Sequence, residues 1–304
     1  MFNDTDYELF LNGLEASCRL LEENRERLNK LNYFPVADKD TGTNMALSMR
    51  KAMEYVLSCG CGHTPLELLE AYYDGLLEYG HGNSGTILTM FAEGFFEFIP
   101  AGKTVNGKDL AVAVSGAVAH AKDGVARVKD GTMLSVTADA ARAGLSIAEL
   151  TDDPAVIWHR ICEEAHAALK MTAVRNSVLR QYGIVDSGAL GMCLILDGLH
   201  SVLLPGEDIP PYDISETPVT SGAAPEELKY PYCTELLIEK NPSANAGELE
   251  KNCAPFGDCL LCVENAGKIK IHIHTDVPQR IKQFASQYGT LIAEKIEDMR
   301  SNVY

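Results

Sequence analysis

Residues 32–44 read NYFPVADKDTGTN, and this short segment decides how we interpret the rest of the chain. Asp38 and Asp40 are two positions apart in a polar stretch, so both carboxylates can turn toward one point. Such oxygen ligands suit Mg²⁺, which commonly takes one or two carboxylates together with substrate phosphates. The Thr-Gly-Thr that follows opens a predicted helix, whose first N–H groups favour an anion. The same spacing also fits an ordinary capped turn before a helix, so the segment alone leaves both interpretations open.

Three further segments resemble the first, because each contains glycine and precedes a predicted helix. They read YGHGNSG at residues 79–85, KDGTML at residues 129–134 and GIVDSG at residues 183–188. Glycine lets a phosphate approach the backbone closely, and Ser84 adds a hydroxyl. One such loop is a weak indication, but four in one helical region together favour nucleotide binding. None of them is a P-loop, which requires Gly-x-x-x-x-Gly-Lys-Ser/Thr after a strand.

Apolar residues recur at helical spacing through the first two hundred residues, which predicts an all-α domain over residues 1–204. The predicted helices span residues 7–30, 43–57, 64–79, 84–98, 108–128, 132–148, 154–171 and 187–204. Five of the 13 prolines then fall between residues 205 and 225, which predicts a linker over residues 205–229. For residues 230–304 we expect a small α/β domain. Its predicted strands span residues 232–238, 259–263 and 269–274. Its predicted helices span residues 246–252 and 278–287.

The composition is that of an ordinary soluble globular protein, with 46% hydrophobic and 23% charged residues. A net charge of −17 argues against nucleic acid or an anionic membrane as a partner, because the surplus of Lys and Arg is missing. The N-terminus carries acids rather than a signal peptide, and no apolar run approaches the roughly 18–20 residues that span a bilayer. The nine cysteines are an odd number without a secretory signal, so we expect a cytoplasmic protein with free thiols. An acidic protein that binds phosphates needs metal ions or backbone N–H groups to do so.

The four loops, in this order and spacing, resemble the nucleotide-binding domain of dihydroxyacetone kinase L subunits (DhaL), and most of all that of FakA, the longer DhaL-type subunit of fatty acid kinase. The most specific motifs are DKDTGTNM at residues 38–45 and GNSG at residues 82–85, supported by VDSG at residues 185–188. The resemblance covers essentially the whole chain. YCTE at residues 232–235 and KIHIHT at residues 270–275 resemble the α/β middle domain of FakA.

This resemblance implies a barrel of eight antiparallel helices that binds ATP at one end, over two Mg²⁺ ions. Asp38 and Asp40 would hold the metals and, with His81, make up the catalytic set. The implied nucleotide-binding residues are Thr41, Thr43, Asn44, Gly82, Asn83, Ser84, Gly85, Thr132, Met133, Leu134, Asp186 and Ser187. The implied activity is transfer of the γ-phosphoryl group of ATP to a fatty acid carboxylate that a separate DegV-like carrier protein presents. A homodimer is expected by family analogy alone.

The sequence departs from the family pattern at several positions. Family members usually carry Gly where this chain has Lys39, and Arg where it has His81. Where DhaL has a third metal-binding aspartate, this chain offers only Asn32 and Tyr33. The sequence also ends at Tyr304, before the partner-docking third domain, so it is either a piece of a longer chain or a natural short form. These departures keep two alternatives open: a dihydroxyacetone-type kinase, and a non-catalytic nucleotide-binding regulator or scaffold.

A second candidate metal site lies in the C-terminal domain. His272 and His274 are separated by one residue in a predicted strand, so their side chains leave the same face. Cys233, in another predicted strand, could complete a Cys-His-His set suited to Zn²⁺. The resemblance to the middle domain implies the same three residues. The alternative is a pair of strand histidines and a buried cysteine without a metal.

Overall fold

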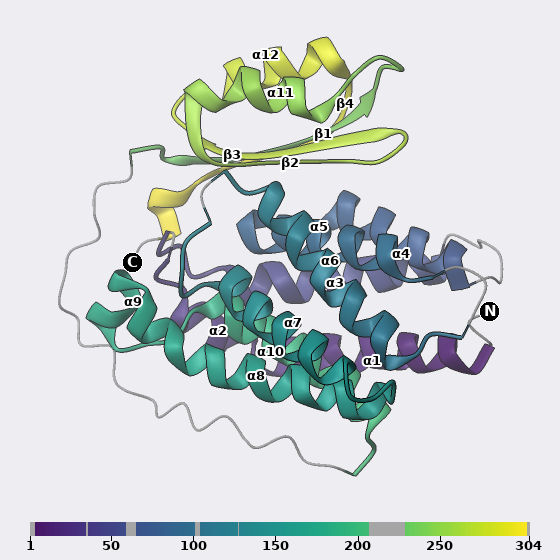
Figure 1. Cartoon of the computed structure of the whole chain (residues 1–304). Helices are drawn as coiled ribbons and strands as arrows, with labels where there is room; N and C mark the ends of the chain where they lie inside the picture. The colour runs from purple at the N-terminus through teal and green to yellow at the C-terminus, as the bar shows by residue number, and fades with distance from the viewer. Residues whose placement is uncertain are drawn as a thin grey trace.

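A computed structural model describes residues 4–34, 36–58, 65–100, 104–126, 128–206 and 229–302. A helical domain comes first, and a small domain built on one antiparallel sheet follows it (Figure 1). The predicted linker lies almost wholly outside the described residues.

The helical domain contains eight long helices and two short ones among the residues described. Their bounds are α1 Asp4–Glu23, α2 Arg25–Leu31, α3 Thr41–Ser58, α4 Pro65–Tyr79, α5 Gly82–Phe98, α6 Gly107–Asp123, α7 Met133–Ala148, α8 Pro154–Arg175, α9 Ser177–Tyr182 and α10 Ser187–Leu203. The eight long helices correspond to the eight that periodicity predicted, which confirms the all-α fold class.

Two local predictions in this domain were wrong. The single helix predicted over residues 7–30 is divided at Asn24 into α1 and α2, and Asn24 leaves the helical conformation with φ −101° and ψ 6°. The short helix α9 was not predicted, because six residues carry too little periodicity to recognise. Asn176 caps its first N–H groups, and Gly183 ends it in the left-handed region at φ +66°.

Apolar side chains fill the inside of the helical barrel. Neighbouring helices along the chain pack on each other, and α10 packs on α1, so the last long helix closes the ring on the first. The single tryptophan, Trp158, is 2% exposed, and its indole N–H donates to the carbonyl of Leu196 at 3.0 Å. Among the described helices, none is long and apolar enough to cross a bilayer.

The second domain is a four-stranded antiparallel sheet with two helices on one face. Its elements are β1 Tyr232–Lys240, α11 Ala246–Cys253, β2 Gly257–Glu264, β3 Lys268–Thr275, α12 Pro278–Tyr288 and β4 Gly289–Asp298. The strand order is β2-β3-β1-β4. The edge strand β4 was not predicted, because none of its residues is fully buried and its sequence lacks a long apolar run.

The two faces of this sheet have different chemistry. Alternate residues of β1 and β3, among them Leu236, Ile271 and Ile273, pack into an apolar cluster with α11 and α12. The residues between them form the polar face: Cys233, Glu235, Lys268, Lys270, His272 and His274. Figure 1 shows the sheet between the helical domain and the pair α11 and α12, so the polar face looks toward the helical domain. Strand periodicity thus brings these polar side chains to the boundary between the domains.

Candidate functional site

The loop that contains the two aspartates is held together by Asn32. This side chain is 2% exposed, and its Oδ1 accepts hydrogen bonds from the backbone N–H groups of Asp40 at 3.0 Å and Thr41 at 2.9 Å. It also accepts from the Thr41 hydroxyl at 2.8 Å, while its Nδ2 donates to the Val36 carbonyl at 2.8 Å. Sequence reasoning noted Asn32 only as a departure from the family. No local pattern marks a residue that organises a loop up to nine positions away.

Asp38 and Asp40 lie side by side. Burial raises the pKa of Asp38 to about 8, and the charge of Asp40 and a hydrogen bond between the two carboxyl groups act in the same direction. Two adjacent carboxylates that are partly removed from water repel each other, and a divalent cation would relieve that repulsion. The donor set therefore fits Mg²⁺, which prefers carboxylate oxygens.

Lys39, between the two aspartates, has φ +57°. This is the left-handed region, which costs most residues about 1–2 kcal/mol and costs glycine almost nothing. The conformation accounts for the glycine expected at this position from the family pattern.

The glycine-rich loop approaches the aspartate loop directly. Gly82, the first residue of α5, has φ +65°, and a Cβ added to it would collide with the Nδ2 of Asn44. The backbone N–H of His81 donates to the hydroxyl of Ser48 in α3 at 3.0 Å. The aspartate loop and the glycine-rich loop therefore meet where α3 and α5 begin. Ser84 is buried in the first turn of α5, next to Gly85.

The third and fourth loops are joined by Asp186. Its Oδ2 accepts the backbone N–H groups of Met133 at 3.1 Å and Ala189 at 2.8 Å, so one carboxylate oxygen caps both α7 and α10. Burial raises the pKa of Asp186 to about 7, and these two hydrogen bonds oppose the increase.

Several hydroxyl groups that were expected to bind nucleotide already have partners inside the protein. Ser187 donates to the Leu28 carbonyl at 2.7 Å, and Thr132 donates to the Lys129 carbonyl at 2.8 Å. Thr43 accepts from the Nδ2 of Asn29 at 3.0 Å. Met133 and Leu134 are both 4% exposed and belong to the core. In the third and fourth loops, these side chains therefore already have partners inside the protein or belong to the core.

The sheet contacts the glycine-rich loop through Glu235, which is 4% exposed. Its Oε1 accepts the backbone N–H of Gly82 at 2.6 Å, and its Oε2 lies 3.0 Å from the Nδ1 of His81. Its Oε1 also lies 3.1 Å from the Nδ1 of His272. Burial alone would raise the pKa of Glu235, but these histidines and nearby Lys270 bring it far below its usual value.

Further contacts hold the domains together around Glu235. Lys270 donates to the Gly80 carbonyl, and burial lowers the pKa of Lys270 to about 8. More peripherally, Lys268 pairs with Glu78 at 2.6 Å. The Nδ2 of Asn265 donates to Asp74 at 2.7 Å, and the Tyr73 hydroxyl donates to the Glu264 carbonyl at 2.9 Å.

Cys233, His272 and His274 come together as the sequence predicted. One potential ligand atom from each lies within 4.8 Å of the others. His272 Nε2 and His274 Nδ1 are buried and have no hydrogen-bond partner among the described residues. Burial lowers the pKa of His274 to about 3, with a contribution from His272, so this imidazole is neutral and able to bind a metal. A thiol and two imidazoles fit Zn²⁺.

A second set of possible ligands shares His274 and adds Asp258 and Cys259 from β2. The Asp258 carboxylate lies 3.8 Å from the Nδ1 of His274, and Cys259 interacts with the side chain of Asn83. β2 thus also reaches the glycine-rich loop.

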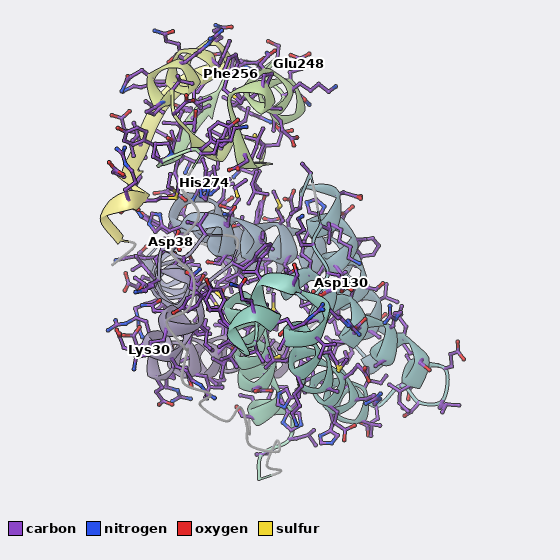
Figure 2. The ribbon with its side chains drawn as sticks, turned by 90° about the vertical axis from the view of Figure 1, so that its left-hand side faces the viewer. Lys30, Asp38, Asp130, Glu248, Phe256 and His274 are labelled. Atoms are coloured by element: carbon purple, nitrogen blue, oxygen red, sulfur yellow. The ribbon has the colours of Figure 1, made fainter. Side chains whose placement is uncertain are left out.

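The aspartate pair and the Cys-His-His set are neighbours. The charges of Asp38 and Asp40 both act on the Cys233 thiol. Figure 2 shows His274 at the boundary between the domains and Asp38 near it, on the end of the helical domain that also carries Lys30 and Asp130. Sequence reasoning treated the two sets as separate sites, and it missed Glu235 and Lys270. Strand alternation could have assigned both residues to the face of the histidines.

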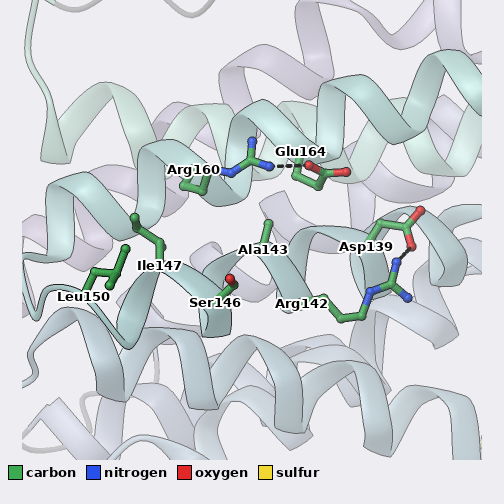
Figure 3. A pocket seen from close by; sticks show the side chains of 8 residues that line it. All are labelled: Asp139, Arg142, Ala143, Ser146, Ile147, Leu150, Arg160 and Glu164. Carbon is green, nitrogen blue, oxygen red and sulfur yellow. Dashed lines mark hydrogen bonds and ion pairs between the residues drawn. The ribbon is translucent and has the colours of Figure 1, made fainter.

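A surface groove of about 310 Å³ lies away from these loops, between α7 and α8. Figure 3 shows that two of its charged side chains face acidic partners: Arg160 pairs with Glu164 at 2.6 Å, and Arg142 pairs with Asp139. Both arginines that line the groove therefore already pair with acidic side chains.

Comparisons with known proteins identify the family. The DAK2 domain model matches residues 35–201, and the model for the FakA-like middle domain of fatty acid kinase matches residues 229–304. An uncharacterized protein of Staphylococcus saprophyticus is 33% identical over 315 aligned residues, which cover 99% of this chain and 56% of the relative. An uncharacterized protein of Staphylococcus aureus strain USA300 is 32% identical, with 99% and 57% covered. The chain therefore spans a little over half the length of these relatives.

A solved structure of the dihydroxyacetone kinase of C. freundii aligns with a TM-score of 0.48 and 20% identity, covering 64% of this chain and 34% of that one. Because the DAK2 model matches more than half of the residues, the chain belongs to the DAK2-domain family. Its second domain is of the type found in the middle of FakA-like fatty acid kinase proteins.

Proposed function

We propose that this chain is the ATP-binding part of a kinase and that nucleotide binds at the domain boundary. The reaction moves the γ-phosphoryl group from ATP to a carboxylate oxygen of a fatty acid, which leaves ADP and an acyl phosphate. The observation that carries this proposal is the pair Asp38 and Asp40 beside the N-terminus of α5. Carboxylates that hold metal ions, next to helix N–H groups that favour anions, suit a metal–nucleotide complex.

Asp38 and Asp40 would hold Mg²⁺, which supplies positive charge for the nucleotide phosphates in an acidic protein. The backbone N–H groups of Asn83 and Ser84 would bind phosphate oxygens at the start of α5. Thr41, Thr43 and Asn44 would line the same end through α3, and the loops at Thr132 and Asp186 would flank the nucleotide. We assign Asp38, Asp40 and His81 to the part of the site where phosphoryl transfer would take place.

Cys233, His272 and His274 would hold Zn²⁺ next to that end of the site. Three protein ligands leave a coordination position for a fourth group, which Asp258 or Cys259 could fill. The metal would fix the polar face of the sheet against the glycine-rich loop, and its charge would offset nearby carboxylates.

The type of the second domain supports a fatty acid as the substrate and a separate protein as its carrier. A middle domain like that of FakA supports a partner-dependent kinase. We propose a DegV-like fatty-acid-binding protein as the partner and a homodimer as the assembly, with the cytoplasm as the compartment. Nucleic acid and membrane are not proposed as ligands, in keeping with the net charge of −17.

The test is phosphoryl transfer with γ-labelled ATP and a cognate DegV-like protein loaded with fatty acid. We expect label in an acyl phosphate, detected by its reaction with hydroxylamine, and loss of that label in an Asp38→Asn, Asp40→Asn variant. A Glu78→Gln variant serves as control, because Glu78 lies on the domain boundary but outside the site. No label with a partner that is active in its own system would contradict the proposal.

A nucleotide-binding regulator without turnover is the second candidate, and the position of His81 favours it. The Nδ1 of His81 faces Glu235, so this histidine is engaged inside the protein. A variant with Lys39→Gly and His81→Arg restores the usual family residues. If turnover was lost through these positions, the variant should gain phosphoryl transfer while the parent binds ATP without transferring it. No gain would count against the loss of turnover through these two positions.

A further inference from the structure

Glu235 occupies the position that links the two halves of the site. One carboxylate oxygen is 2.6 Å from the backbone N of Gly82 and 3.1 Å from the Nδ1 of His272. The other is 3.0 Å from the Nδ1 of His81. One side chain of β1 thus contacts the first N–H of α5 and an imidazole of β3. No sequence motif assigned Glu235 a role.

The contact with His272 determines which nitrogen of that ring can bind a metal. A carboxylate only accepts hydrogen bonds, so the Nδ1 that faces Glu235 must carry the proton. The Nε2 then has a free lone pair, and it is this Nε2 that is buried without a hydrogen-bond partner among the described residues. A carboxylate that orients a histidine in this way also makes the ring a better metal ligand.

The contact with Gly82, in contrast, makes the start of α5 less favourable for an anion. The first N–H of a helix is a favourable place for a phosphate oxygen. In this protein the Glu235 carboxylate takes that N–H, and its negative charge lies beside the glycine-rich loop. The same side chain therefore favours metal binding on the sheet and disfavours negative charge at the start of α5.

We propose that Glu235 is a positioning residue that couples the two ligand sites, and this inference rests on the proposed function. It holds His272 in the tautomer that presents Nε2 to a metal, and it competes with nucleotide phosphate for the N–H of Gly82. Metal and nucleotide affinities are therefore linked through one carboxylate.

The test uses the full chain with Glu235→Gln, which keeps the size and removes the charge, and Glu235→Ala, which removes both oxygens. Affinity for Zn²⁺ is measured by competition with a chelator, and affinity for Mg–ATP by calorimetry. The tautomer of His272 is read from its ¹⁵N chemical shifts, with a His272→Gln sample for assignment. This last measurement needs neither ligand.

We expect Glu235→Ala to lower Zn²⁺ affinity about 10–100-fold, the usual effect of removing such a partner, with a smaller loss in Glu235→Gln. Both variants should bind Mg–ATP several-fold more tightly, and the Nδ1-protonated form of His272 should lose its dominance in Glu235→Ala. Opposite changes in the two affinities distinguish positioning from a structural role, which would weaken both.

The matched control is Glu78→Gln, which removes the Lys268–Glu78 pair at the same boundary and leaves Glu235 in place. It should change neither affinity. The inference is overturned if Glu78→Gln reproduces the effects, if both affinities fall together, or if His272 keeps its Nδ1 proton in Glu235→Ala. A parent chain that binds no Mg–ATP would overturn the proposed function and the nucleotide half of the coupling. The tautomer of His272 would still test the other half of the coupling, the role of Glu235 in orienting His272 toward a metal.

Discussion

Asp38 and Glu235 come from opposite sides of the domain boundary, and the pKa values of their carboxyl groups are shifted in opposite directions. Burial and the adjacent Asp40 raise the pKa of Asp38 to about 8. Burial also acts to raise the pKa of Glu235, but hydrogen bonds from His272 and His81 more than reverse it. The polar face of the sheet and the glycine-rich loop together therefore supply partners for the buried charge of Glu235. The aspartate loop supplies no such side-chain partner to Asp38 among the described residues.

This difference indicates which side of the domain boundary requires a bound cation. A buried carboxylate is stable as an anion when donors surround it, and two adjacent carboxylates removed from water are stable only when a proton or a cation neutralises them. For this reason we place Mg²⁺ on the helical side and a fixed network of residues on the sheet side. Four changes test that contrast.

The largest expected effect concerns Asp186, another buried carboxyl group, which like Asp38 has no cationic partner among the described residues. Its folded-state pKa of about 7 lies above the roughly 3.9 of an unfolded chain. Its contribution to stability is thus fully present below about pH 4 and is lost as pH rises through 7, with an upper limit of about 4 kcal/mol. Asp186→Asn keeps an oxygen for both N–H groups and removes the charge.

We therefore expect Asp186→Asn to be more stable than the parent at pH 8, with the advantage disappearing toward pH 4. Urea denaturation at a series of pH values measures it. A constant difference between the two proteins across that range would show that the buried charge costs nothing.

The next effect concerns the ligands of the sheet. Cys233→Ser should reduce Zn²⁺ affinity by about a hundredfold or more, because a neutral hydroxyl replaces a thiolate ligand. Mg–ATP affinity should change much less than Zn²⁺ affinity, because Cys233 is not among the residues that would bind the nucleotide. Cys262→Ser is the matched control, since Cys262 packs against the apolar cluster on the other side of the sheet. Equal loss of Zn²⁺ in both variants would remove Cys233 from the ligand set.

A smaller effect is expected at the start of α5. Gly82→Ala places a Cβ against Asn44 in the left-handed region, and the conformation alone costs about 1–2 kcal/mol. We expect that loss of stability together with weaker Mg–ATP binding. Gly183→Ala provides a control, because Gly183 has a similar φ of +66° with nothing within 4 Å of an added Cβ. It should lose stability without losing affinity, and a similar drop in affinity for both would exclude a specific role for Gly82.

The smallest effect belongs to the rim of the domain boundary. The Lys268–Glu78 pair is partly exposed, so Lys268→Met should cost less than about 1 kcal/mol in thermal or urea unfolding. The loss should shrink further at high salt. A cost of several kcal/mol would mean that charges at the rim, rather than the network at Glu235, hold the domains together.

Much of the fold could be predicted from the sequence, because long amphipathic helices and buried strands leave clear periodic patterns. The shared face of His272 and His274 followed from strand alternation, and the structure confirms it. The same rule includes Lys270, but periodicity does not tell which face of a sheet meets another domain. That depends on contacts between residues about 150 positions apart, such as His81 and Glu235. The role of Asn32 and the short helix α9 also depend on such tertiary contacts rather than on local pattern.

The most direct test of the central claim is the Mg²⁺ dependence of ATP binding. Calorimetric titrations compare the parent with an Asp38→Asn, Asp40→Asn variant, each in excess Mg²⁺ and in a chelator. We expect Mg²⁺ to raise the ATP affinity of the parent by about tenfold or more, a difference of about 1.4 kcal/mol. We expect no such increase in the variant. Equal affinity of the parent with and without Mg²⁺, or an undiminished Mg²⁺ effect in the variant, would contradict a metal–nucleotide site at the two aspartates.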